Sequence, residues 1–242
     1  MNFSIKHQFN LSLLTTLCTA WLCILPATTF AQNVNKAAAP DLDLAIKYFN
    51  RELSPEGVLR ESSYQEKMLR RNNGHVWSYR VLPGKMAAND TAHHNHEHKD
   101  FNYIVLSRHV RFDGSKISVE FINDHDRQVI NIVPTEYENV NFDGSWPNTY
   151  YLIDPKVVAA MPVSQRPSSV GNARWHEVVK NGLFQRVLWD EKLSIPLVIE
   201  TGNQKNTFFQ RITVSADAKL EKDLPWNHLQ GYAQKEYSDF LD

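Results

Sequence analysis

The second half of the chain alternates apolar and polar residues with a period of two, and this feature constrains the fold more than any other. Four segments, 174–180, 183–189, 195–200 and 208–214, are separated by short polar turns. One of these turns is Asn181-Gly182, and an asparagine–glycine pair between alternating segments is a strong short-range signal for a β-hairpin. The sequence therefore predicts four antiparallel strands in this region.

The middle of the chain shows the same period. His75 to Leu82, Phe101 to Phe112, Ile117 to Phe121 and Val129 to Val133 alternate in the same way, with polar turns such as Asp113-Gly114 between them. Alternation bounded by turn residues is typical of half-buried strands. These segments predict an antiparallel meander.

Residues 37–71 show a different pattern, with apolar side chains at near-helical spacing. Ser54-Pro55-Glu56 has the form of a helix N-cap followed by proline at the first helical position, and Asn72-Asn73-Gly74 has the form of a helix stop. The sequence therefore predicts two short helices here. It also predicts one or two helical turns at 154–161 and a closing helix from Pro225.

Together these elements predict an α+β protein, in which a long antiparallel sheet carries a few helices. A strongly curved sheet of this kind can enclose an apolar cavity. About 210 residues follow the N-terminal segment described next, which is enough to bury one substantial core. We therefore expect residues 32–242 to form a single domain.

The N-terminus has the three parts of a secretory signal peptide. Lys6 precedes a mostly apolar run at 11–25, and a small-residue cleavage site ends at Ala31, before Gln32. The apolar run is shorter than the roughly 20 residues that span a bilayer, although a retained N-terminal anchor is the alternative. We expect an exported, periplasmic protein that is cleaved near Ala31-Gln32 and has no transmembrane segment in its mature chain.

Composition excludes several classes of function for the mature chain. Both cysteines, Cys18 and Cys23, lie in the predicted signal, so disulfide and thiol chemistry are excluded. Each cysteine follows a leucine, where a lipoprotein signal requires a small residue. Removal of Lys6 with the signal leaves 25 basic against 27 acidic residues, a balance of −2. Such a chain has no basic field that would attract nucleic acid.

Four of the ten histidines, His93, His94, His96 and His98, are concentrated at 90–100. In an extended segment, alternate histidines point to one side at about 6.6 Å spacing, and two of them could share zinc or copper with a third ligand from elsewhere. Asp124, His125 and Asp126 are possible third ligands. The alternative is a polar loop whose histidines are simply solvated.

No catalytic constellation accompanies these histidines. His125 lies between two aspartates and His176 precedes Glu177, so either imidazole could act as a general base. However, the mature chain has no cysteine nucleophile, no G-x-S-x-G elbow and no glycine-rich phosphate loop. The sequence therefore favours a binding protein over an enzyme and predicts no cofactor, apart from the zinc or copper alternative.

The hairpin series in Gly171–Val214 resembles a known family. Leu188-Trp189-Asp190 ends one strand, a short turn follows, and Ile195-Pro196-Leu197 opens the next strand. This arrangement is similar to that of the periplasmic lipoprotein-carrier superfamily, which includes the LolA and LolB lipoprotein localisation factors and a related sigma-E regulator. The resemblance covers about a fifth of the chain. It implies an unclosed β-barrel with helices capping its concave side and an apolar interior that receives acyl chains or a partner peptide.

We therefore expect a non-enzymatic periplasmic binding or carrier protein for a hydrophobic ligand (a lipid or acyl chain) or an envelope-protein segment. The alternative is a periplasmic zinc- or copper-binding protein organised around the histidine cluster. Large aromatic residues on the strands line a cavity or form ordinary core, and a one-residue slip in register inverts the predicted face. The residues predicted to face the cavity are Trp77, Tyr79, Tyr103, Val105, Val119, Phe121, Val187 and Trp189.

Overall fold

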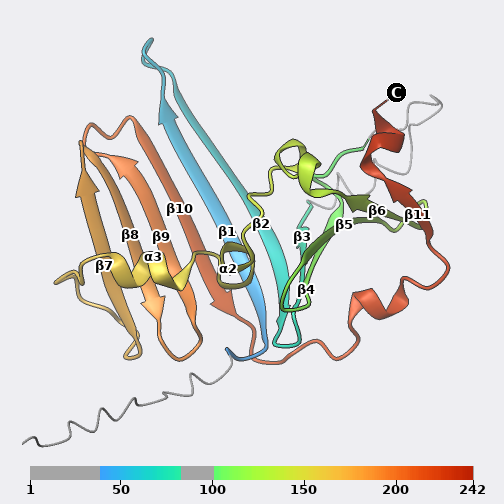
Figure 1. The fold of residues 1–242 in the computed structure, drawn as a ribbon. Coiled ribbons are helices and arrows are strands. Elements are labelled where there is room, and N and C mark those ends of the chain that lie inside the picture. Colours follow the sequence, from blue (N-terminus) through green and yellow to red (C-terminus); the bar gives the residue numbers. More distant parts are fainter. Residues whose placement is uncertain (1–38, 83–100, 242) are drawn as a thin grey trace, which may run out of the picture. The chain divides into compact units, whose positions relative to one another are not determined.

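The computed structural model describes residues 39–82 and 101–241, which are built around one mixed sheet of eleven strands (Figure 1). Neighbouring strands are antiparallel except for β11, which runs parallel to β6. The order across the sheet is β11-β6-β5-β4-β3-β2-β1-β10-β9-β8-β7, so β11 and β7 are its two edges and the sheet does not close. The predicted α+β class with an unclosed, mainly antiparallel sheet is confirmed.

The strands are β1 (Leu42–Leu53), β2 (Leu59–Arg71), β3 (His75–Arg80), β4 (Ser107–Phe112), β5 (Ile117–Asn123), β6 (Gln128–Ile132), β7 (Ala173–Lys180), β8 (Leu183–Asp190), β9 (Ile195–Asn203), β10 (Phe208–Ala216) and β11 (Ala233–Glu236). The helices are short: α2 (Trp146–Tyr151), α3 (Pro155–Ala160) and the 3-10 turns η1 (Pro134–Glu136), η2 (Glu138–Val140), η3 (Pro225–His228) and η4 (Tyr237–Phe240). The four strands predicted for the second half and the helical turn at 154–161 are present.

The two helices predicted within 37–71 are wrong, because this region forms the long β1–β2 hairpin. Leu42, Leu44 and Ile46 of β1 point to one face of the sheet, which is a period of two. Ser54-Pro55-Glu56 begins a hairpin turn rather than a helix, and Gly57 adopts a φ of +83° there. β1 pairs with β2 on one side and with β10 on the other, and this tertiary pairing overrides the local spacing.

Two further predicted elements differ from the structure. The strand predicted for 101–112 begins only at Ser107, because the backbone and side chain of Asn102 accept hydrogen bonds from Val105 and Ile104 and form a turn. The closing helix predicted from Pro225 is replaced by η3, the short strand β11 and η4. Gly231, with a φ of +81°, precedes β11.

One face of the sheet, here called the helix face, is covered in part by α2 and α3. Tyr150 of α2 packs on Leu44 and Met68 of β1 and β2, and Val158 of α3 packs with Val187 of β8. Figure 1 shows both helices lying against the half of the sheet that runs from β1 to β7. Burial of these apolar side chains is the main source of stability for this layer.

The opposite face, here called the outer face, is covered over β2, β3 and β5 by the segment 217–232. Trp226, Leu229 and Tyr232 of this segment pack on a cluster that contains Trp77 and Ile122. The segment follows β10 directly and leads to β11 at the far edge of the sheet. It therefore connects the two halves of the sheet across the outer face.

Two consecutive arginines at the end of β2 fasten these layers. Arg70 has no exposed surface, and its guanidinium donates four hydrogen bonds to the carbonyl oxygens of Pro40, Tyr150, Leu193 and Ser194 at 2.9 to 3.3 Å. No carboxylate among the described residues forms an ion pair with it. Arg70 therefore ties the start of β1, α2 and the β8–β9 turn to one point of β2.

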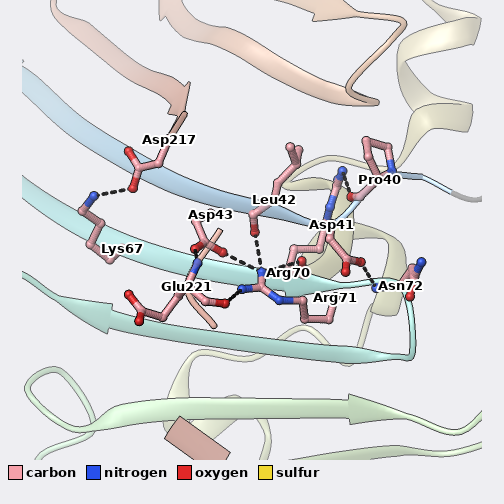
Figure 2. Close-up of polar contacts among 10 residues, drawn as sticks. All are labelled: Pro40, Asp41, Leu42, Asp43, Lys67, Arg70, Arg71, Asn72, Asp217 and Glu221. Atoms are coloured by element: carbon pink, nitrogen blue, oxygen red, sulfur yellow. Dashed lines mark hydrogen bonds and ion pairs between the residues drawn. The ribbon is translucent and has the colours of Figure 1, made fainter. Parts of the chain in front are cut away.

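Arg71, the next residue, points to the outer face (Figure 2). Its Nη1 donates to Asp43 Oδ1 at 2.6 Å, and its Nη2 donates to the Glu221 carbonyl at 2.9 Å. Asp43 also accepts a hydrogen bond from the Glu221 backbone amide. Lys67 and Asp217 form a second ion pair along the same segment at 2.8 Å. These contacts hold the start of the 217–232 segment against β1 and β2.

We expect Arg70→Lys to lower the free energy of unfolding by roughly 3 kcal/mol, because a lysine ammonium has three donors on a narrower head and leaves buried carbonyl groups unsatisfied. Urea unfolding followed by circular dichroism measures the difference. Arg60→Lys, at an exposed position of the same strand, is the matched control. A loss below about 0.5 kcal/mol, typical of surface substitutions, would contradict the role given to Arg70.

A pair of histidines lies beneath the 217–232 segment. His75 Nδ1 and His109 Nε2 share a hydrogen bond of 3.0 Å, and His109 Nδ1 lies 3.3 Å from Glu120, which also pairs with Arg111. The ring of Trp226 stacks on both imidazoles. Burial lowers the pKa of His75, and the neighbouring His109 and Arg111 lower it further.

This lowered pKa predicts a loss of stability in mild acid. The unfolded chain binds a proton at His75 near the ordinary histidine pKa of about 6.5, whereas the folded chain binds it only at lower pH. The free energy of unfolding should therefore fall as pH drops below about 6.5. His75→Gln should reduce this slope, and His125→Gln, in an exposed turn, should not. Urea midpoints at a series of pH values test the expectation, and equal slopes in all three proteins would contradict it.

Candidate functional site

Two adjoining pockets lie on the helix face and together form what we call the cleft. The inner pocket has a volume of about 250 Å³ and the outer pocket about 460 Å³, and Arg108 and Asn141 line both of them. The outer pocket falls in the usual size range of small-molecule sites, and the inner pocket lies just below it. Arg108 and Asn141 therefore mark the junction between the two.

The inner pocket has a floor of buried core residues and a polar rim. Phe121 is buried in a core cluster with Val140, and Leu106 packs against that cluster. Strand alternation places Glu66 of β2 and Arg80 of β3 on the helix face above this floor, and register pairs them directly. The full lining is Tyr64, Glu66, Ser78, Tyr79, Arg80, Tyr103, Ile104, Leu106, Arg108, Phe121, Val140 and Asn141.

The polar rim is fixed by contacts among side chains of β1, β2 and β3. Tyr48 stacks on Tyr64 at a centroid distance of 4.4 Å, and its hydroxyl donates to Glu66 Oε2 at 3.1 Å. Burial, followed by the neighbouring Glu66, raises the pKa of Tyr48, so this phenol stays protonated and remains a donor. The Arg80 guanidinium lies 3.8 Å from the centre of the Tyr64 ring. Glu66 and Arg80 are therefore held at the rim by aromatic neighbours.

The arginines of the cleft lack acidic partners within the described part of the chain. Neither Arg80 nor Arg108 forms an ion pair with a carboxylate there, although Glu66 shares the inner pocket with both. The Nε of Arg80 is buried without a hydrogen-bond acceptor in the same ranges. A buried donor without an acceptor is costly.

The outer pocket is polar and carries acidic residues. Its lining is Arg108, Glu138, Asn141, Phe142, Asp143, Asn148 and Thr149. Asp143 accepts hydrogen bonds from the Ser145 amide at 2.9 Å and from Asn148 Nδ2 at 2.6 Å. These bonds hold the Asp143 carboxylate at the start of α2, beside the pocket.

Two of the eight residues predicted to face a cavity, Tyr103 and Phe121, come together in the inner pocket. Tyr79 also borders this pocket, but strand alternation places its side chain on the outer face with that of Trp77. Val119 is buried behind them in the same core cluster, and Val105 is half-buried in the turn that precedes β4.

The other three predicted residues lie elsewhere in the fold. Trp77 is buried on the outer face against Trp226, and Val187 and Trp189 pack with residues of α3. A role for all eight in ligand binding stays a prediction, and among them the side chains of Tyr103 and Phe121 belong to one pocket.

The predicted metal cluster lies outside the described residues. His93, His94, His96 and His98 belong to 83–100, so a zinc or copper site there stays a prediction. Within residues 39–82 and 101–241, no group of three or more histidine, cysteine, aspartate or glutamate side chains is arranged to hold a metal ion. His125, one possible third ligand, pairs with Asp126 at 2.7 Å in an exposed turn.

Sequence analysis missed the charged residues of the cleft. Glu66 lies in a segment that was assigned to a helix, and Arg80 and Arg108 lie on strands whose alternation gave no reason to single them out. Their proximity depends on the β2–β3–β4 register, in which Glu66 faces Arg80 and Ser78 faces Arg108. These residues could have been found only if the sequence had shown that residues 42–71 form a hairpin.

No helix among the described residues is both long enough and apolar enough to span a bilayer. No family model matches the sequence, and no curated protein matches it.

Solved structures similar to this one include a domain from Vibrio parahaemolyticus named as an outer membrane lipoprotein-sorting protein, with 10% identity over 78% of this chain and 91% of that chain and a TM-score of 0.33. A LolA superfamily protein from Nitrosomonas europaea has 10% identity, coverage of 80% and 93%, and a TM-score of 0.35. The Pseudomonas aeruginosa MucA/MucB complex has 11% identity over 81% of this chain, a TM-score of 0.38, and only 58% of its own chain covered. One of these solved structures is thus named as a member of the superfamily whose hairpin series residues 171–214 resemble.

Proposed function

We propose that this chain is an exported, non-enzymatic binding protein of the periplasm that holds a hydrophobic ligand, a lipid or acyl chain, in the cleft. The observation that carries the proposal is the inner pocket itself, where the apolar side chains of Ile104 and Leu106 lie beside a rim of tyrosine and arginine. Small-molecule sites typically combine such an apolar lining with a few convergent polar groups.

The arrangement suits binding better than catalysis. The charged groups at the inner rim are Glu66, Arg80 and Arg108. Within the described part of the chain, the hydroxyl that is hydrogen-bonded to Glu66 belongs to Tyr48, whose pKa is raised. A phenol that stays protonated is a hydrogen-bond donor and not a nucleophile. An envelope-protein segment is the other occupant that a cleft with apolar side chains can accept, and the experiment below separates the two.

Lipid binding should depend on the inner pocket. Ile104 lines this pocket and is 46% exposed, so Ile104→Asp introduces a charge there with little effect on folding. We expect this substitution to weaken binding of a fluorescent fatty acid at least tenfold, on the order of the cost of burying one carboxylate. Val179→Asp, at a 51% exposed valine on the edge strand β7, is the matched control.

Mass spectrometry of organic extracts from the exported protein, purified without detergent, provides the second readout. Wild type and Val179→Asp should carry lipid, and Ile104→Asp should carry less. Absence of lipid and of fatty-acid binding in the wild type would reject the lipid ligand. It would leave an envelope-protein segment as the occupant to test, by crosslinking from position 104.

Export gives a separate prediction. We expect the periplasmic fraction to contain a chain that begins at Gln32, because signal peptidase cleaves after small residues such as Ala31. Intact mass spectrometry and N-terminal sequencing identify the product. A full-length chain retained with the inner membrane would show that the N-terminal segment is an anchor instead.

A further inference from the structure

The charges of the cleft follow an order along its length. Ile104 and Leu106 are apolar side chains that line the inner pocket, Arg108 lies at the junction of the two pockets, and Glu138 and Asp143 line the outer pocket beyond it. An apolar region, a cation and a pair of carboxylates therefore succeed one another in adjoining spaces.

The local charge balance differs between the two pockets. The inner pocket has Arg80 and Arg108 against Glu66, and the Glu66 carboxylate already accepts a hydrogen bond from Tyr48. The outer pocket has Glu138 and Asp143 against Arg108 alone. One end of the cleft therefore favours an anion and the other end favours a cation.

We infer that the cleft recognises a zwitterionic amphiphile, with its tail against Ile104 and Leu106, its phosphate against Arg108 and its ammonium group facing Glu138 and Asp143. In a phospholipid-type headgroup the phosphate lies between the tail and the ammonium, which is the same order as that of the complementary groups in the cleft. Charge-assisted hydrogen bonds from guanidinium to phosphate are among the stronger polar contacts in proteins. This inference rests on the proposed function and adds the class of headgroup.

The outer pocket has room for a headgroup. The outer pocket, at about 460 Å³, is the larger of the two and is lined mainly by polar side chains, as a headgroup requires. Asn141 lines both pockets, and its side-chain amide can donate or accept at the junction. A simple fatty acid would leave Glu138 and Asp143 without a cationic partner.

The test compares three probes with the same tail, used below their micelle concentrations: dodecylphosphocholine, dodecyl phosphate and dodecyltrimethylammonium. Calorimetry on the wild-type protein should show dodecylphosphocholine binding at least about tenfold more tightly than either other probe, a ratio that corresponds to 1.4 kcal/mol. Equal affinity for all three, or a preference for a singly charged probe, would overturn the inference and leave the proposed function standing. Binding of none of the three would overturn both.

Two variants test which residues bind the headgroup. Glu138→Lys, at an exposed position, should reverse the preference so that dodecyl phosphate binds better than dodecylphosphocholine. Arg108→Gln should weaken both phosphate-bearing probes and not dodecyltrimethylammonium. The matched controls are Glu191→Lys in the exposed β8–β9 turn and Arg174→Gln on the edge strand β7, and both should retain the wild-type order of affinities. A wild-type order in Glu138→Lys and Arg108→Gln would place the headgroup elsewhere and overturn the inference.

Discussion

The arrangement of the helix face depends on the buried guanidinium of Arg70. A buried cation is costly unless its charge and its donors are satisfied. Here carbonyl oxygens from three separate segments accept hydrogen bonds from both terminal nitrogens, and only Nε has no acceptor among the described residues. The guanidinium also lies 4.8 Å from the centre of the Tyr150 ring. Because these carbonyl groups must converge on one point, the start of β1, α2 and the β8–β9 turn are fixed relative to β2.

The geometry of the cleft depends on these hydrogen bonds of Arg70. Arg70, Glu66 and Tyr64 lie on the same face of β2. The strand that carries the buried arginine therefore also forms one wall of the inner pocket. Asn148 and Thr149 of α2 line the outer pocket, and α2 is the helix whose Tyr150 carbonyl is bound by Arg70. The relative placement of the two walls therefore depends on the hydrogen bonds of Arg70.

The outer face is organised by the neighbouring arginine in the same way. Arg71 and Asp43 hold the backbone of Glu221, and the segment that follows covers Trp77, His109 and Ile122 with Trp226 and its neighbours. Side chains of consecutive strand residues point to opposite faces, so two adjacent arginines fasten two different layers. The outer face over β2, β3 and β5 is consequently occupied by the chain itself, whereas the cleft on the helix face is open.

The sequence alone determined the elements whose signals are local. The β7–β8 hairpin was predictable because Asn181 and Gly182 both adopt positive φ, as the tight turn requires, between segments that alternate strictly. The strands β5, β6, β9 and β10 and the helical turn at α3 were predictable for similar reasons. These features depend on neighbours within a few residues, which a single sequence displays directly.

Only the tertiary structure decided the rest. β1 is a strand because it pairs with β10, more than 150 residues away, and no local pattern reports such a partner. The cleft brings Arg80 and Arg108 beside Asn141 through a register of three strands and a turn at η2. A sequence could therefore name Tyr103 and Phe121 but not the charged residues that accompany them. Trp77, Val187 and Trp189 alternate just as clearly, yet they pack elsewhere, because alternation shows that a strand has two faces and not which face the rest of the chain covers.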